Sequence, residues 1–388
     1  MESESIVFSI FLIFSGAAVV SSLALFTRQP LIVGYIVLGG LFGPHGLNLV
    51  SDGKTLEQIS HIGIVFLLFL LGLDLQPRNF GKLLGRSALV TLTSGVVLCA
   101  TGSGISHWLG LPWVESLIVG ISLMFSSTII GIKLLPTTVL HHKHTGEIII
   151  AILLIQDMVA IVTLILISGT NHISDAKAWI GVVISLPALY IGARYFVRWI
   201  LLPLLTRFDR FHEYIFLLAI GWCLGVAELA QALGLSLEIG AFIAGISLAN
   251  SPIAQYIATN LKPLRDFFLI LFFFSIGAAF NFALIPDIWV TSLLLTLLVL
   301  ILKPTLHAKL LSSLGESRSM SWEAGFRLGQ TSEFSLLIAF IASSQGLIGV
   351  AASHVIQATA ILTFLFSTYI VVFRFPTPIA LSDRLRRD

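Results

Sequence analysis

Long apolar stretches alternate with short polar turns along nearly the whole chain. A helix needs about 20 predominantly apolar residues to cross the hydrocarbon of a bilayer. Several stretches reach this length, and others are shorter and contain glycines. The pattern predicts an all-α polytopic membrane protein with about 13 transmembrane helices. We expect them near Ile6–Thr27, Leu31–Leu47, His61–Gln76, Ser87–Leu109, Val114–Leu135, Gly146–Ser168, Trp179–Leu202, Tyr214–Leu233, Leu237–Asn250, Phe267–Phe282, Trp289–His307, Ser321–Ser344 and His354–Phe373.

The composition agrees with a chain that has little soluble mass. Hydrophobic residues make up 56% and charged residues 11% of the 388 residues, whereas soluble domains carry about 25% charged residues. The two cysteines, Cys99 and Cys223, lie in apolar runs and show no metal-binding spacing. The acidic start, Met1–Ser5, lacks the basic region of a signal peptide. We therefore expect the first apolar run to stay as a membrane helix, and we expect no enzyme activity, cofactor or nucleic-acid partner.

Basic residues orient the predicted helices. In a scheme of thirteen spans, the turns on one side hold nearly all of them, and the other side holds only Lys54 and Lys177. The positive-inside rule then predicts an N-terminus outside and a C-terminus in the cytoplasm, and we expect a bacterial inner membrane. The residues on the basic side include Arg28, Arg78, Lys82, Arg86, Lys133, Lys143, Arg194, Arg198, Arg207, Arg210, Lys262, Arg265, Lys309, Arg318 and Arg374.

The two halves of the chain echo each other. Span two (Gly34–Pro44) resembles span nine (Gly240–Asn250), and span three (Val65–Asp74) resembles span ten (Leu271–Ala278). Because the offset is odd, the halves would be inverted-topology repeats, as in many secondary transporters. The predicted organisation is a first repeat over 1–168, a linker helix over 169–213, a second repeat over 214–375 and a short basic tail over 376–388, without a regulatory nucleotide-binding domain.

One acidic residue, Asp157, lies near the midpoint of the apolar run 148–167, directly after Gln156. Insertion scales put the cost of an Asp at the centre of a membrane helix at about 2.5 to 3.5 kcal/mol. A helix that keeps such a group usually uses it to move ions or protons. The alternative is an Asp neutralised by a neighbouring helix only to fix packing.

Polar clusters interrupt spans five and twelve, which correspond in the two repeats. Span five contains Ser126, Ser127 and Thr128, and span twelve contains Thr331, Ser332 and Glu333 among other polar residues. Breaks at these clusters would create crossed discontinuous helices whose ends face a shared ion site. Alternatively, the hydroxyl groups hydrogen-bond back to their own helices.

Two basic residues lie close to these clusters in the predicted spans. Lys303 interrupts the apolar span eleven. It either extends to the membrane interface or needs a buried partner such as Asp157, Glu333 or a helix C-terminus. Arg327 precedes Glu333 by six residues, so these two side chains are not neighbours on a continuous helix.

The chain resembles the membrane domain of the monovalent cation:proton antiporter-2 family. The resemblance rests on Gly43-Pro44, Phe69–Asp74, Gly234–Gly245, Gln156-Asp157, Lys303 and Ser332–Phe334. The Gln-Asp pair is closest to the Kef-like potassium efflux branch. The resemblance implies that Asp157 is the cation and proton carboxylate, that Gln156, Ser127 and Thr128 complete the site, and that Lys303, Glu333, Thr331, Ser332 and Arg327 support it. It also implies a homodimer in the lipid bilayer, and the small residues of spans two and nine would suit its interface.

The sequence thus predicts a secondary transporter that exchanges a monovalent cation for protons by alternating access, with K⁺ favoured and Na⁺ as the second candidate. A proton-coupled symporter of a small organic anion is the alternative. It would need a cationic pocket, for which only Lys303 and Arg327 are candidates. A channel would need a continuous polar pore, whereas the polar residues here cluster at one depth.

Overall fold

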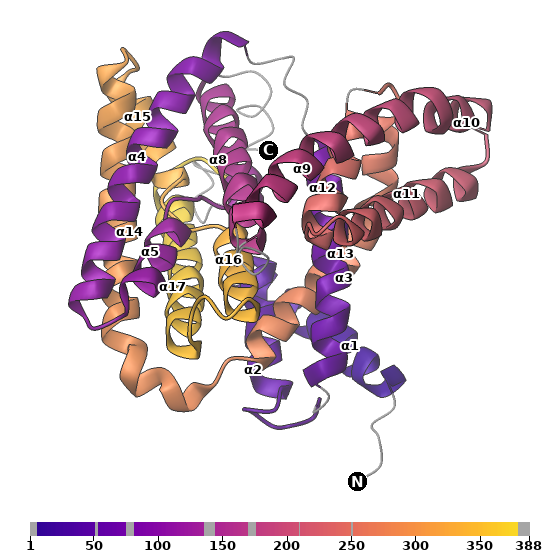
Figure 1. The fold of residues 1–388 in the computed structure, drawn as a ribbon. Helices are drawn as coiled ribbons and strands as arrows, with labels where there is room; N and C mark the ends of the chain where they lie inside the picture. Colours follow the sequence, from indigo (N-terminus) through magenta and orange to yellow (C-terminus); the bar gives the residue numbers. More distant parts are fainter. Residues whose placement is uncertain are drawn as a thin grey trace. The chain divides into compact units, whose positions relative to one another are not determined.

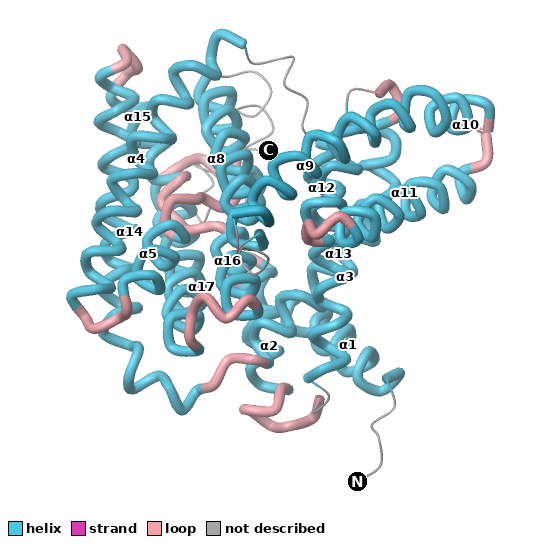
Figure 2. Tube along the Cα trace, viewed as in Figure 1, coloured by secondary structure: helices cyan, strands magenta, loops and turns pink. Residues whose placement is uncertain are grey.

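The computed structural model describes residues 6–50, 53–74, 81–135, 144–169, 176–208, 210–249 and 251–378. Within these ranges the regular secondary structure is helical (Figures 1 and 2). In the described part of the chain, seven helices are long and apolar enough to cross a membrane, judged by length and composition, and five further apolar helices are shorter. The predicted all-α membrane fold is confirmed, while the count of thirteen spans stays a prediction.

The helices group into two compact units, each of which takes segments from both halves of the sequence. Unit 1 comprises residues 1–15, 38–79 and 165–279. It contains α3 (Gly53–Asp74), α9 (Ala176–Phe196), the π-helix η3 (Val197–Leu201), α10 (Leu202–Arg207), α11 (His212–Ala232), α12 (Leu237–Ala249) and α13 (Ala254–Ala278).

Unit 2 comprises residues 16–37, 80–164 and 280–388. Two helices, α1 (Ile6–Phe26) and α2 (Leu31–Phe42), have residues in both units, and so does α8 (His144–Gly169). The rest of unit 2 contains α4 (Gly81–Trp108), α5 (Trp113–Ser122), α6 (Thr128–Lys133), η4 (Phe282–Leu284), α14 (Ile285–Ser313), α15 (Arg318–Arg327), α16 (Glu333–Ser344) and α17 (Val350–Arg374). The predicted boundaries of the sequence repeats stay a prediction.

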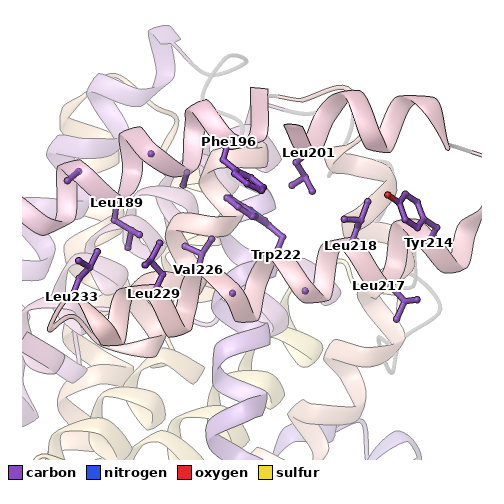
Figure 3. Close-up of a pocket in the computed structure, with 15 residues that line it drawn as sticks. Leu189, Phe196, Leu201, Tyr214, Leu217, Leu218, Trp222, Val226, Leu229 and Leu233 are labelled. Carbon is purple, nitrogen blue, oxygen red and sulfur yellow. The ribbon is translucent and has the colours of Figure 1, made fainter. Parts of the chain in front are cut away.

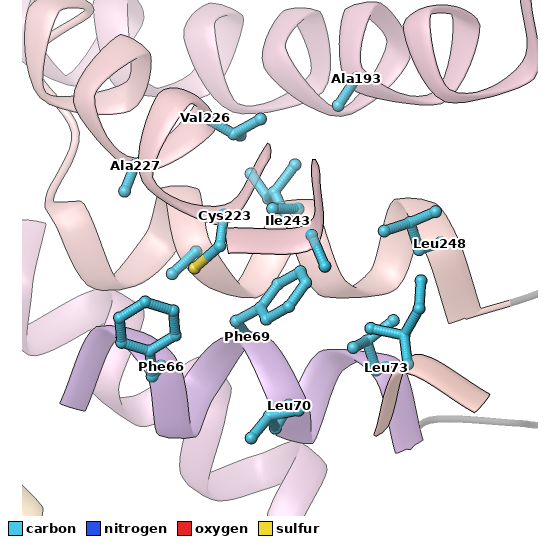
Figure 4. Close-up of a cluster of buried hydrophobic side chains, with 14 of the residues drawn as sticks. Phe66, Phe69, Leu70, Leu73, Ala193, Cys223, Val226, Ala227, Ile243 and Leu248 are labelled. Carbon is cyan, nitrogen blue, oxygen red and sulfur yellow. The ribbon is translucent and has the colours of Figure 1, made fainter. Parts of the chain in front are cut away.

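Helix α3 lies at the centre of unit 1 and packs against α12 and α13. Its buried side chains Phe66, Phe69 and Leu73 meet Cys223 of α11 and Ile243 of α12 in one apolar cluster (Figure 4). Glycines bring the backbones together, since a Cβ at Gly72 would lie 2.7 Å from the carbonyl oxygen of Phe242. Such close approach is how small residues join helices in a membrane.

The small residues of spans two and nine are used for packing inside the chain. Gly39 and Gly43 of α2 lie against the backbone of α13, at Phe274 and Ala278. Gly240 and Gly245 of α12 lie equally close to α11 and α3. These glycines are therefore covered within a single chain, and the expectation that spans two and nine suit a dimer interface stays a prediction.

Unit 2 is organised around α14, which packs against α4, α15 and α17. A Cβ at Gly325 of α15 would lie 2.5 Å from the carbonyl oxygen of Pro304 in α14, and Gly329 also lies against Pro304. An apolar cluster that includes Val90 of α4 and Ile149 of α8 fills the space beside this contact. This packing fixes the helix ends that form the candidate site.

Candidate ion-binding site

The predicted interruption of span five is present as a break between two short helices. Helix α5 ends at Ser122 and α6 begins at Thr128. The Ser127 side chain caps α6 by accepting a hydrogen bond from the backbone N–H of Ile130 at 3.1 Å. Within the break, the backbone N–H of Ser126 donates to Oε1 of Gln156 on α8 at 2.9 Å. The Gln156 side chain thus accepts a hydrogen bond from a buried N–H group that has no partner within the broken helix.

The matching interruption of span twelve separates α15, which ends at Arg327, from α16, which begins at Glu333. Ser332 caps α16, and its hydroxyl accepts from the N–H of Phe334 at 3.2 Å. Ser335 completes a capping box, because its hydroxyl accepts from the N–H of Ser332 at 3.3 Å. The polar cluster that the sequence contains here is therefore the start of a new helix.

The two breaks are hydrogen-bonded to each other. The N–H of Ser127 donates to the carbonyl oxygen of Thr331 at 2.9 Å, and Oγ of Ser126 donates to that of Leu328 at 2.9 Å. Oγ of Ser335 donates to the carbonyl oxygen of Ser122 at 2.5 Å. The prediction of crossed discontinuous helices is confirmed. For Ser126 and Ser335, the alternative that the hydroxyls donate back to their own helices does not hold.

Asp157 lies on α8 beside the first break and is 7% exposed. The hydroxyl of Thr128 lies 3.1 Å from each of its two carboxylate oxygens. Thr128 is the first residue of α6, so the carboxylate lies near the end of a helix that attracts negative charge. Among the described residues, no Lys or Arg forms an ion pair with Asp157.

A second carboxylate belongs to the same neighbourhood. Glu333, the first residue of α16, is 8% exposed and lies within electrostatic range of Asp157. Oγ of Ser332 lies 3.5 Å from its Oε2. Each broken helix therefore places its N-terminus and one or two hydroxyl groups close to a buried acid.

Lys303 does not extend to the membrane interface. Its side chain is fully buried, and Nζ donates to the carbonyl oxygens of Leu123, Phe125 and Gln330 at 3.1, 2.6 and 2.9 Å. Leu123 caps the C-terminus of α5, and Gln330 follows the end of α15. Of the partners considered from the sequence, the structure selects the helix C-terminus, where the helix dipole favours a cation.

Arg327 makes a separate set of contacts. It pairs with Glu323 one turn earlier on α15, with Nη2 2.8 Å from Oε1. Its guanidinium also donates to the carbonyl oxygens of Leu134 at 2.9 Å and Pro376 at 2.7 Å. Arg327 thus joins the end of α6 to the segment after α17.

Helix α17 supplies partners that the sequence analysis did not single out. Oγ1 of Thr363 lies 2.8 Å from Oγ1 of Thr331, and Ser367 donates to Oε1 of Gln330 at 3.0 Å. The sequence signal that could have identified these partners is the spacing of Thr363 and Ser367, two hydroxyl residues four positions apart on one face of an apolar helix. Ser122 and Leu328 act through backbone carbonyls, and no side-chain pattern marks such a role.

The arrangement can hold either a proton or a small cation. A buried carboxylate is costly when ionised and unpaired, so a bound cation or a proton would relieve the same cost. Helix ends, backbone carbonyls and hydroxyl groups surround it in unit 2, which is the donor chemistry of ion sites in transporters with broken helices.

The family model of the sodium/hydrogen exchanger transmembrane domain matches residues 10–377. The chain belongs to this family. The match confirms the resemblance predicted from the sequence motifs, and it places the chain among transporters. K(+) efflux antiporter 5 of Arabidopsis thaliana is 29% identical over 356 residues, which are 88% of this chain and 60% of the relative.

Bacterial relatives of the family also match. The glutathione-regulated potassium-efflux system protein KefC of Cronobacter sakazakii is 32% identical over 323 residues, which are 79% of this chain and 50% of the relative. The two relatives support the Kef-like branch, and the chain spans between half and three-fifths of their lengths. The sodium proton antiporter MjNhaP1 from Methanocaldococcus jannaschii shares the fold, with a TM-score of 0.67 at 15% identity over 93% of this chain and 97% of that one.

Proposed function

We propose that this chain exchanges a monovalent cation for protons at Asp157. The observation that supports this most directly is a carboxylate that is 7% exposed and whose hydrogen bonds come from the hydroxyl of Thr128, next to the crossed breaks. A proton and a cation would compete for this one acid. Exchange follows if only the loaded forms change their access from one side to the other.

K⁺ is the proposed cation, with Na⁺ as a poorer substrate. Gln156 places a neutral amide next to Asp157, so that pair carries only one acid. A weakly hydrated cation suits a site whose ligands are mainly amide, hydroxyl and carbonyl oxygens. The names of the two curated relatives, both potassium efflux proteins, support the same choice. Gln156, Ser127 and Thr128 would complete the site around Asp157.

The anion symporter that the sequence left open is less well supported. Lys303 donates to three carbonyl oxygens, and Arg327 is bound by Glu323 and two carbonyl oxygens. Both groups therefore already donate hydrogen bonds to partners within the protein. An organic anion would have to displace these contacts in order to bind.

The setting of the site completes the proposal. The helices that hold it belong to unit 2, so we propose that unit 2 acts as the transporting bundle in alternating access. We propose a bacterial inner membrane as its location, and the basic turns support an N-terminus outside and a C-terminus in the cytoplasm. We also propose a homodimer, which the family resemblance supports.

Ion flux in proteoliposomes tests the proposal. Asp157→Asn should insert and fold but lose cation-dependent proton flux, because an amide cannot carry the proton. Asp287→Asn, which removes an exposed carboxylate in the first turn of α14, is the matched control and should retain flux. Transport at the unsubstituted rate in Asp157→Asn would eliminate this mechanism.

A further inference from the structure

An open apolar groove runs between α9 and α11 in unit 1. None of the residues that line it belongs to the candidate ion site. Its volume is about 860 Å³, near the upper end of the range for ligand sites of about 300 to 1,000 Å³. Leu189 and Phe196 line one side, and Trp222, Val226 and Leu229 line the other (Figure 3). Trp222 turns its N–H away to the carbonyl oxygen of Ala244. The groove therefore offers an almost wholly apolar surface.

Three glycines leave the groove unfilled. A Cβ at Gly192, Gly221 or Gly225 would meet no atom within 4 Å, and all three residues line the groove and are exposed. The groove is thus open at these three positions, and the stacked rings of Phe196 and Trp222 form its floor between the two helices. A long, flexible hydrocarbon chain fits this shape and this chemistry better than a polar molecule does.

One end of the groove lies next to a turn that is flanked by arginines. Tyr214 and Leu201 lie at that end (Figure 3), and the ring of Phe208 packs edge-on against Tyr214 with centroids 5.3 Å apart. The turn between α10 and α11 therefore borders the groove. Arg207 is the last residue of α10, Arg210 lies in the turn, and both are exposed.

Further groups strengthen the basic character of this region. Arg194 and Arg198 are exposed on α9 and η3, and the Arg198 guanidinium lies 5.9 Å from the centroid of the Trp199 ring. The acidic residues in the stretch from 194 to 213 are Asp209 and Glu213, so arginines outnumber acids. Trp199 and Phe211 are exposed aromatic residues of the kind found at the level of lipid headgroups.

We propose that the groove is a binding site for an anionic phospholipid. An acyl chain would lie along the groove over the stacked rings of Phe196 and Trp222, and the headgroup phosphate would be bound by Arg207 and Arg210. Guanidinium groups bind phosphate oxygens in a bidentate manner, and basic pockets between membrane helices recognise anionic headgroups. This inference does not depend on which ion the protein transports.

Thermal stability and native mass spectrometry with two lipids test the proposal. The purified protein in detergent would receive dioleoyl-phosphatidylglycerol or dioleoyl-phosphatidylcholine, which share acyl chains and differ in net charge. We expect the anionic lipid to raise the melting temperature by several degrees and to remain bound in the mass spectrum. The zwitterionic lipid should bind at least tenfold more weakly. Equal effects of the two lipids would overturn the proposal.

Variants at the groove and at the basic end separate the two parts of the site. Gly221→Leu/Gly225→Leu fills open space and should abolish lipid retention without lowering the melting temperature in detergent. Gly104→Leu on α4, where a Cβ also meets nothing within 4 Å, is its control. Arg207→Gln/Arg210→Gln should remove the preference for the anionic lipid. Lys309→Gln/Arg318→Gln, which neutralises two exposed charges elsewhere, should keep it.

A second copy of the chain could also occupy such a groove. The oligomeric state of Gly221→Leu/Gly225→Leu distinguishes that occupant from a lipid. If Gly221→Leu/Gly225→Leu converts a dimer to a monomer but retains phosphatidylglycerol, the groove is a subunit interface and the lipid proposal is wrong. Loss of lipid with an unchanged oligomeric state supports the proposal.

Discussion

The ammonium nitrogen of Lys303 lies 2.6 Å from the carbonyl oxygen of Phe125, inside the first helix break. The same nitrogen donates to Gln330 in the second break at 2.9 Å. One side chain on an unbroken helix thus joins the two interrupted helices. Its positive charge lies where the C-terminal ends of α5 and α15 concentrate negative charge.

Lys303→Ala should therefore lower stability. It leaves three buried carbonyl oxygens without their donor, and each unsatisfied buried group costs about 1 to 3 kcal/mol. We expect the melting temperature in detergent to fall by roughly 5 °C or more. Lys309→Ala, at an exposed position on the same helix, is the control and should change it little. Equal melting temperatures of the two variants would show that the Lys303 contacts contribute nothing to stability.

Thr128→Val should weaken cation binding without unfolding the protein. The substitution keeps the shape of the side chain and removes the hydroxyl that lies 3.1 Å from both oxygens of Asp157. A hydrogen bond to a charged group is worth about 1.5 to 3 kcal/mol, which corresponds to a loss in affinity of roughly tenfold or more. The cation concentration for half-maximal flux in proteoliposomes measures this. Thr128→Ser should keep most of the affinity. An unchanged half-maximal concentration in Thr128→Val would show that Thr128 does not take part in cation binding.

Exchange by the unsubstituted protein should be electroneutral, with one K⁺ exchanged for one H⁺. The residue that precedes Asp157 in the sequence is the neutral Gln156, and Lys303 is held by carbonyl oxygens in the described structure. The measurement is proton flux in proteoliposomes whose membrane potential is clamped with valinomycin while Na⁺ is varied. Separate flux assays with K⁺, Na⁺, Li⁺ and Rb⁺ establish selectivity. Strong voltage dependence contradicts the stoichiometry, and a preference for Na⁺ contradicts the choice of cation.

Gly325→Val should disrupt the second break indirectly. A Cβ at this position would lie 2.5 Å from the carbonyl oxygen of Pro304, so α15 would have to move away from α14. Overpacking of this kind typically costs about 1 to 3 kcal/mol. We expect a lower melting temperature together with reduced flux. Gly104→Val, at a position with open space, is the control for the difference in helix propensity between Gly and Val. An equal fall in melting temperature and flux in Gly104→Val would show that helix propensity, and not the contact with Pro304, causes the effect.

The sequence determined the membrane class, the approximate positions of the helices and the polar interruptions. Apolar runs, the buried acid Asp157 and the hydroxyl clusters depend on local composition, and local composition is enough to show where a bilayer helix is costly or broken. The pairing of span five with span twelve also came from the sequence, through the order of the repeats. The structure then placed Ser127 and Thr331 in direct hydrogen-bond contact.

Only the tertiary structure decided how the polar groups are paired. Lys303 and Phe125 are separated by 178 residues, and the acceptor is a backbone carbonyl that every residue possesses. For the same reason, the contacts of Arg327 with Leu134 and Pro376 have no side-chain signature in the sequence. The glycines of spans two and nine indicated close helix contact correctly, but which helix covers them depends on how the chain folds back on itself. Contacts made through backbone atoms and shape become visible only when the helices are packed.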